Sequence, residues 1–341
     1  MPDEHSASVL PTIGYGAANL GNLHRAVSDE EARKILDAAW DAGVRYFDTA
    51  PHYGLGLSER RLGEFLRTKP RDSFTLSTKV GRLLRSAEDG TPEWDTTDGF
   101  HVLSTLRRRW DFTAEGIGAS IQESLSRLGM DRIDLVLLHD PERYDLALAV
   151  DSALPALVGL REAGLVGSVG VGSMSADAIT ACVQGADLDT VMVAGRHTLI
   201  EQHAGMLDAC RRTGTRIVAA SVFNSGLLAS AQPVRTGRYE YGDVPDDVWT
   251  RVSAIAAVCA EFDTPLPAAA MQFVLQHPSV ESVVVGSSRP EQIRQNVELL
   301  DLAVPAALWT RLLEDGLIDP ASIPADPIAT SPNDLPKGAR A

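Results

Sequence analysis

Four polar side chains of this sequence occur where they could carry out proton transfer together. Asp48, Lys79 and His139 each end a short apolar run. Tyr53 follows Asp48 closely in the chain. A free tyrosine has a pKa of ~10, which an ammonium group held by an aspartate is expected to lower. A histidine could orient a substrate oxygen, so the four residue types predict a general acid/base suited to hydride transfer.

These groups can meet only if the apolar runs before them lie side by side as strands. Short, near-continuous apolar runs are typical of parallel strands buried on both faces. Eight such runs alternate with amphipathic segments, which favours a closed α/β structure, the (β/α)8 TIM barrel, over an open doubly wound sheet. The active site is then expected at the C-terminal mouth of the barrel. The predicted strands are Ile13–Ala17, Val44–Asp48, Phe74–Lys79, Ile133–His139, Val166–Gly172, Thr190–Gly195, Arg216–Ser221 and Ser282–Gly286.

Start and stop signals support helices between these runs. Ser28 precedes an acidic turn and an amphipathic stretch that stops at Gly43, as an N-cap and a glycine after a helix do. Thr113 and Gly129 bracket a second stretch in the same way. The 341 residues fit one barrel with insertions, so we expect a single domain over residues 1–341, with a core from about 9 to 315 and a tail over 319–341.

Two long connections interrupt the repeat, over residues 81–110 and 232–247. Both follow strand ends, where barrel active sites are built. Their aromatic residues, among them Trp94, Phe100, Trp110 and Tyr239, could stack on a substrate ring, and packing within the loops is an equal alternative. The tail either closes the site or frays.

Composition excludes several other classes of protein. A net charge of −15 argues against a nucleic-acid partner. The three cysteines follow no ligand spacing, which predicts no metal site and a reducing, cytoplasmic setting. No apolar stretch approaches the ~20 residues of a membrane helix, and Met1–Ser8 lacks a signal-peptide pattern. We expect a soluble protein that acts on a small molecule; its oligomeric state is not readable from the sequence.

Two segments around the candidate acid/base resemble the signature of the aldo/keto reductase family closely. They are Phe47-Asp48-Thr49-Ala50-Pro51-His52-Tyr53-Gly54 and Ser58-Glu59-Arg60-Arg61-Leu62-Gly63. Ser77-Thr78-Lys79 and Leu137-Leu138-His139 are similar to the strand ends that carry the family's lysine and histidine. The resemblance implies an NAD(P)-dependent oxidoreductase with a catalytic tetrad of Asp48, Tyr53, Lys79 and His139, in which Tyr53 is the acid/base.

The same resemblance implies where a nicotinamide cofactor binds. The first predicted strand is not followed by G-x-G-x-x-G, which disfavours a Rossmann site. Residues 221–228 look like the family's pyrophosphate loop, and residues 286–296 look like its adenosine-phosphate segment. The resemblance also concerns the nicotinamide ring. Ser173 lies near the position where the family usually has an asparagine, and Arg196 or His197 could replace the family's usual glutamine. The implied cofactor-binding residues are Ser173, Ser221, Phe223, Asn224, Ser225, Gly226, Leu228, Gly286, Ser287, Ser288, Gln292, Gln295 and Asn296.

The adenosine segment also bears on the choice between NAD and NADP. NADPH-preferring members usually carry a lysine where this chain has Gly286 and an arginine where it has Gln292. A 2′-phosphate needs charge-assisted partners, so the missing cations favour NAD. Arg289 or Arg294 could substitute, which leaves NADP possible.

Three segments resemble the sugar-dehydrogenase branch of the family: Pro51–Glu59, His139–Glu142 and Phe223–Leu228. That branch includes D-threo-aldose (L-fucose) dehydrogenases, L-galactose dehydrogenase and pyridoxal 4-dehydrogenase. The resemblance implies that the cyclic hemiacetal of an aldose is oxidised to a lactone by hydride transfer to NAD. Two alternatives stay open. The same tetrad could oxidise pyridoxal or reduce a general aldehyde or ketone, or the chain could be a regulatory subunit that binds the cofactor without turnover.

Overall fold

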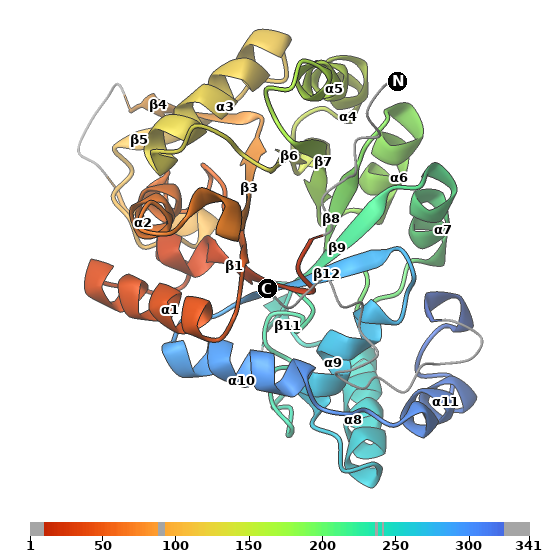
Figure 1. The fold of residues 1–341 in the computed structure, drawn as a ribbon. Helices are drawn as coiled ribbons and strands as arrows, with labels where there is room; N and C mark the ends of the chain where they lie inside the picture. Colours follow the sequence, from red (N-terminus) through yellow and green to blue (C-terminus); the bar gives the residue numbers. More distant parts are fainter. Residues whose placement is uncertain (1–9, 88–92, 236–237, 241, 324–341) are drawn as a thin grey trace.

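Eight parallel strands close into a barrel, and helices surround it (Figure 1). This computed structural model describes residues 10–87, 93–235, 238–240 and 242–323. Around the barrel the strands follow one another in chain order, and the last pairs with the first. They are β1 (Ile13–Gly16), β2 (Tyr46–Asp48), β3 (Thr75–Val80), β6 (Leu135–His139), β7 (Ser168–Ser173), β8 (Thr190–Ala194), β9 (Arg216–Ala220) and β12 (Val280–Gly286).

The eight predicted strands are all present, and only their ends differ. Val44, Ile133 and Val166, for example, lie before β2, β6 and β7 rather than in them. Strand ends are set by cross-strand partners, which a single sequence does not display. The fold prediction is therefore confirmed.

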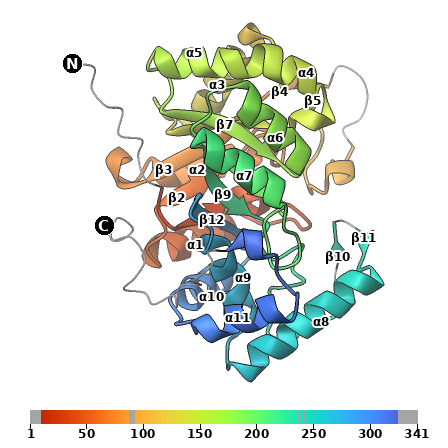
Figure 2. The same cartoon turned by 90° about the vertical axis from the view of Figure 1, so that its right-hand side faces the viewer.

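Helices follow the strands and cover the outside of the barrel (Figures 1 and 2). The Ser28 hydroxyl accepts a hydrogen bond from the Glu31 amide at the start of α1 (Asp29–Asp41). Thr113 caps α3 (Ala114–Leu128) in the same way, and Gly129 ends it with φ 62°. Within the described ranges, no helix combines the length and apolar character needed to cross a membrane. The other helices are α2 (Leu57–Leu66), α4 (Leu146–Leu148), α5 (Leu154–Glu162), α6 (Ala176–Gly185), α7 (Ala204–Thr213), α8 (Asp246–Glu261), α9 (Leu266–Leu275), α10 (Pro290–Leu300) and α11 (Ala306–Glu314).

Alternation along the strands separates two apolar layers. Residues such as Val136 and Leu138 of β6 belong to the large cluster that also contains the helix residues. Their neighbours Leu135 and Leu137 belong to a second, smaller cluster made almost entirely of strand residues. Because successive side chains of a strand point to opposite faces, the smaller cluster fills the barrel interior. Its members are Leu10, Tyr46, Leu135, Leu137, Met192, Val218, Ala220 and Val284.

The two long connections contain hairpins that the sequence patterns did not predict. β4 (Arg82–Ser86) pairs antiparallel with β5 (Leu106–Trp110), and β10 (Arg238–Tyr239) pairs with β11 (Gly242–Asp243). Both hairpins lie on the right-hand side of the barrel in Figure 2. The three successive arginines of β5 hide its alternation, because all are polar whichever way they point. Of the predicted tail, residues 324–341 lie outside the described residues.

Candidate active site

The barrel interior brings three of the four candidate catalytic residues to one end. Asp48 follows Tyr46 by two positions in β2, and His139 follows Leu137 by two positions in β6. Tyr46 and Leu137 belong to the interior cluster, so the alternation of side chains turns Asp48 and His139 inward as well. Lys79 pairs in register with Leu137 on the intervening strand β3. All three therefore lie at the carboxyl ends of neighbouring strands.

Asp48 and Lys79 form a buried ion pair. Lys79 Nζ lies 2.6 Å from Asp48 Oδ2, and each side chain is only 3% exposed. Lys79 also donates to the Thr49 carbonyl at 3.1 Å, and the Ser77 hydroxyl donates to Asp48 Oδ1 at 2.7 Å. Burial alone lowers the pKa of Lys79, but the Asp48 carboxylate and the Tyr53 hydroxyl outweigh it and raise that pKa overall. Lys79 is thus a fixed cation.

Tyr53 lies against this cation, on the loop between β2 and α2. Lys79 Nζ is 4.8 Å from the centre of the Tyr53 ring. Burial raises the pKa of Tyr53, Lys79 lowers it and Asp48 raises it, and the net direction is upward. The lowering expected from the ammonium is therefore present but smaller than the effect of burial. Tyr53 is held in its protonated form at neutral pH.

Two glycines fix the loop that carries Tyr53. Gly54 has φ +61°, and a Cβ built on it would lie 2.3 Å from the Gly21 carbonyl oxygen. A Cβ on Gly21 would in turn lie 2.6 Å from the carbonyl carbon of Tyr53. Contacts this close exclude any side chain at either position. The Tyr53 loop therefore packs directly on the backbone that follows β1.

A neutral histidine completes the group. The His139 ring centre lies 6.0 Å from that of Tyr53. Burial, followed by the nearby Arg82 and Lys79 charges, holds the pKa of His139 well below its usual range. His52 packs edge-on to His139 at 5.5 Å, and burial together with Arg82 and Arg108 also lowers its pKa. Neutral His139 can hydrogen-bond an oxygen without competing for its proton.

A cavity of about 780 Å³ opens beside these groups. Phe100 packs against Tyr53 with ring centres 6.1 Å apart, and its neighbours Gly99 and His101 line the cavity. The tetrad itself is outside the lining. Several residues implied for cofactor binding line it together: Ser221, Phe223, Asn224, Ser225, Gly226 and Gly286.

The lining after β9 has the backbone shape of an anion site. Ser221, Asn224, Ser225 and Gly226 all have positive φ, at 55°, 44°, 59° and 94°. Such turns gather backbone N–H groups into a concave surface that suits phosphate oxygens. The Oδ1 atom of Asn224 is buried and has no hydrogen-bond partner among the described residues. This part of the cavity therefore has the backbone shape and an unpaired side-chain oxygen suited to a polar ligand.

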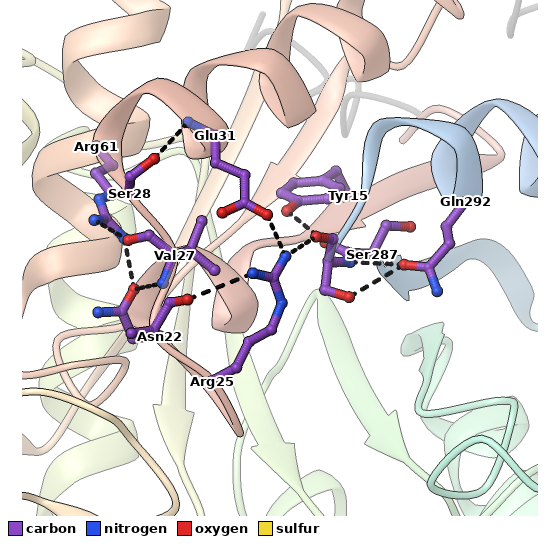
Figure 3. A network of polar contacts seen from close by, with 11 residues as sticks. Tyr15, Asn22, Arg25, Val27, Ser28, Glu31, Arg61, Ser287 and Gln292 are labelled. Atoms are coloured by element: carbon purple, nitrogen blue, oxygen red, sulfur yellow. Dashed lines mark hydrogen bonds and ion pairs between the residues drawn. The ribbon is translucent and has the colours of Figure 1, made fainter.

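Polar contacts hold the loop that follows β12, next to the cavity-lining Gly286 (Figure 3). The side-chain oxygen Oε1 of Gln292 accepts hydrogen bonds from the Ser288 backbone amide at 3.0 Å and from the Ser288 hydroxyl at 3.3 Å. Arg25 donates to the Ser288 carbonyl at 2.7 Å and pairs with Glu31 at 2.5 Å (Figure 3). The donors of Ser288 are therefore used within the protein. Of the remaining implied residues, Leu228, Ser287 and Asn296 are buried and Gln295 is exposed.

Comparison with known proteins identifies the family to which this architecture belongs. Residues 12–314 match the Aldo/keto reductase family. The chain belongs to that family. Its members are oxidoreductases that use nicotinamide cofactors.

Several relatives of this aldo/keto reductase are similar over nearly their whole length. It is 61% identical over 312 residues to D-threo-aldose 1-dehydrogenase of Pseudomonas sp, covering 91% of this chain and 95% of the relative. It is 37% identical over 326 residues to pyridoxal 4-dehydrogenase of Microbacterium luteolum, with 91% and 95% covered. Among solved structures, an aldo-keto reductase from Bacillus halodurans in its holo form superposes with a TM-score of 0.71 at 24% identity, covering 92% and 93%, which shows the shared fold.

The structure of this aldo/keto reductase separates the two residues that could replace the family's usual glutamine. Arg196 lines the cavity, donates to the Met174 carbonyl at 2.6 Å and pairs with Glu240. His197 is fully buried and packs between Phe273 and His277, with ring centres 5.3 and 5.8 Å away. Arg196 is therefore the one placed to meet a ligand. Ser173 is buried, and its hydroxyl accepts a hydrogen bond from the Ser175 amide at 2.8 Å.

The aromatic residues of the two long connections have different surroundings. Tyr239 lines the cavity and donates a hydrogen bond to Glu201. Trp94 is 59% exposed and is not in the lining. Trp110 stacks on Tyr144, with ring centres 5.5 Å apart. Of the three substrate candidates, only Tyr239 borders the cavity.

Sequence reasoning missed two charged residues beside the tetrad of this aldo/keto reductase. Asp140 directly follows His139, and Arg82 begins β4 just after Gly81. They form a partly buried ion pair. The available signal was their spacing: Arg82 is three positions after Lys79, and Asp140 is one position after His139. A single sequence does not show that two such residues meet.

Proposed function

We propose that the chain is an NAD-preferring aldose 1-dehydrogenase that oxidises the cyclic hemiacetal of a D-threo-aldose or galactose-type sugar to its lactone. The observation that carries the chemistry is the Lys79–Asp48 pair buried against Tyr53, with neutral His139 beside it. The 61% identity to a D-threo-aldose 1-dehydrogenase supports the substrate class. The tetrad roles and the single-domain organisation of residues 1–341 are part of this proposal.

Each tetrad residue has a task that its surroundings suit. Lys79 stabilises the Tyr53 phenolate, which takes the proton of the anomeric hydroxyl and becomes the neutral phenol. Asp48 keeps the ammonium in place. His139, neutral, donates a hydrogen bond to the same substrate oxygen. A nicotinamide cofactor, when bound, would supply the hydride acceptor, and we expect the Ser221–Gly226 turn, Arg196 and Gly286, which line the same cavity, to hold it.

Preference for NAD follows from the loop after β12. Neither Gly286 nor Gln292 supplies a cation, and the Ser288 donors already bond to Gln292. A 2′-phosphate would have to displace that bond and would gain no charged partner from position 286 or 292. Arg289 and Arg294 are both exposed, and they leave some use of NADP open.

Replacing Gln292 with arginine is expected to strengthen NADP⁺ binding by about tenfold and to leave NAD⁺ binding within about threefold. The new guanidinium would give the phosphate a partner. Dissociation constants from quenching of protein fluorescence measure both. The control is Glu298→Gln, on the exposed side of the same helix, which changes the net charge equally. An equal gain in NADP⁺ affinity in both variants would show an effect of net charge alone.

The pH dependence of the two reaction directions is expected to differ in sign. Because the pKa of Tyr53 is raised above ~10, the phenolate needed for oxidation becomes more abundant as the pH rises. Sugar oxidation should therefore accelerate from pH 7 to 10, whereas carbonyl reduction should not. The pKa of His139 is lowered, so its protonation should not reduce either rate between pH 6 and 8. Initial rates across this range test both statements; a plateau in oxidation near pH 7 would contradict the raised pKa.

The proposed function is tested by initial rates of NAD⁺ and NADP⁺ reduction with L-fucose, D-arabinose, L-galactose and pyridoxal. Rapid NADH formation with a sugar would support the proposal. Oxidation of pyridoxal alone would favour the second candidate, which the 37% identity to a pyridoxal 4-dehydrogenase supports. No turnover with tight cofactor binding would favour a regulatory subunit.

A further inference from the structure

A second, partly buried ion pair lies next to the tetrad and has no part in the proton transfer. Arg82 bonds to Asp140 Oδ2, and their side chains are 4% and 14% exposed. The same Asp140 oxygen lies 3.6 Å from Nε2 of His139. Asp140 is also close enough to Tyr53 to act on its charge. The pair therefore borders the position of the reacting oxygen.

The backbone and the surrounding rings hold both members in place. Asp140 has φ 44°, in the left-handed region, and its amide donates to the Gly172 carbonyl at 2.8 Å. Aspartate and asparagine adopt this region more readily than other non-glycine residues, so the backbone here suits an aspartate. The Arg82 guanidinium lies 4.3 Å from the centre of the Trp110 ring, which stacks on Tyr144. These contacts fix the Asp140 backbone and cover one face of the Arg82 guanidinium.

The pair is not explained by stability alone. Burying two charges loses about as much hydration energy as their attraction returns, so apolar residues would serve the fold equally well. Arg82 also keeps a buried Nε donor that has no hydrogen-bond partner among the described residues. A carboxylate and a guanidinium together can accept from and donate to the same hydroxyl group. The unpaired Arg82 donor and the nearby His139 indicate that this pair binds a polar ligand.

We propose that Asp140 and Arg82 bind the substrate hydroxyl on the carbon adjacent to the one that is oxidised. The proposal rests on the proposed function. Suppose that Tyr53 and His139 hold the reacting oxygen. The distance from that oxygen to the oxygen on the next carbon of the sugar is then comparable to the 3.6 Å between His139 Nε2 and Asp140 Oδ2. The pair then selects aldoses with a free 2-hydroxyl over simple aldehydes.

The test compares two sugars that differ at this hydroxyl. D-Arabinose carries it, and 2-deoxy-D-ribose is the same pentose without it. The wild-type protein is expected to prefer D-arabinose. Asp140→Asn should lower kcat/KM for D-arabinose by about 10- to 100-fold, the loss of a hydrogen bond to a charged group, and change kcat/KM for the deoxy sugar by less than about threefold. Asparagine tolerates the left-handed backbone, so the variant should fold.

Controls separate this role from a structural one. Arg85→Gln removes another arginine of β4, whose partner Glu123 lies on α3, and should leave both sugars unaffected. Arg82→Lys keeps the charge but not the fork of donors, and should repeat the Asp140→Asn pattern. The dissociation constant of NAD⁺ should be unchanged in all variants.

Other results would overturn the proposal. Equal losses on both sugars would mean that the pair only positions His139. Equal wild-type kcat/KM for both sugars would mean that the 2-hydroxyl is not recognised. Wild-type oxidation of pyridoxal with no activity on either sugar would instead overturn the proposed function, which the same assay distinguishes.

Discussion

Replacing Tyr53 with phenylalanine is expected to lower turnover by about 10²–10⁴-fold and to leave NAD⁺ affinity within about twofold. The change removes the hydroxyl that exchanges the proton and keeps the ring that packs on Phe100 and faces Lys79. Steady-state rates with the preferred sugar and fluorescence titration of NAD⁺ measure the two quantities. Activity is the quantity that should change, because the hydroxyl contributes to chemistry rather than to cofactor binding.

A matched control is available a short distance away. Tyr144→Phe removes a hydroxyl from a ring that stacks on Trp110 and is 48% exposed. That variant should keep nearly all activity. If Tyr53→Phe kept full activity as well, the assignment of the acid/base would be wrong. If it lost NAD⁺ binding in proportion to turnover, the hydroxyl would act through the cofactor instead.

Lys79→Met is expected to affect both turnover and stability. It leaves Asp48 as a buried carboxylate without its cation, which destabilises a fold by about 3–5 kcal/mol. It also removes the charge that stabilises the Tyr53 phenolate. Urea unfolding and steady-state kinetics report the two losses separately.

The double variant Asp48→Asn with Lys79→Met separates these two effects. Without either charge, the site should recover much of the lost stability, because no unpaired ion stays buried. Turnover should stay low, because the ammonium is still missing. A double variant as unstable as Lys79→Met would mean that packing, and not the orphaned charge, determines the loss. Recovery of turnover would contradict the role given to Lys79.

Much of the tetrad could be predicted because strand periodicity carries it. Apolar runs that end in Asp48, Lys79 and His139 define both the strands and their carboxyl ends, and parallel pairing brings those ends together. Tyr53 needed the additional information of the family signature, since a loop residue has no periodicity to place it. The barrel followed from the same runs, and only the strand ends shifted.

The sequence did not predict effects that depend on distance. The charge on Lys79 was foreseen, but burial acts more strongly on Tyr53 and reverses the net direction of its pKa. The hairpin β4–β5 lies in a long connection whose sequence shows no strand alternation, so Arg82 could not be placed beside Asp140. Trp94 and Tyr239 are both aromatic residues in long connections, and the sequence does not distinguish them. The fold shows that Trp94 is exposed and that Tyr239 lines the cavity.

The contact between Gly21 and Gly54 limits how this enzyme can evolve. Backbone meets backbone there, so neither position can change to another residue without displacing the loop that carries Tyr53. Single substitutions at these two positions offer no gradual route to a new placement of the acid/base. Substrate range can instead change at residues away from that contact, such as those of the long connections that contain β4–β5 and β10–β11. The position of the acid/base is therefore constrained by this glycine contact, whereas the surrounding loops can vary in sequence.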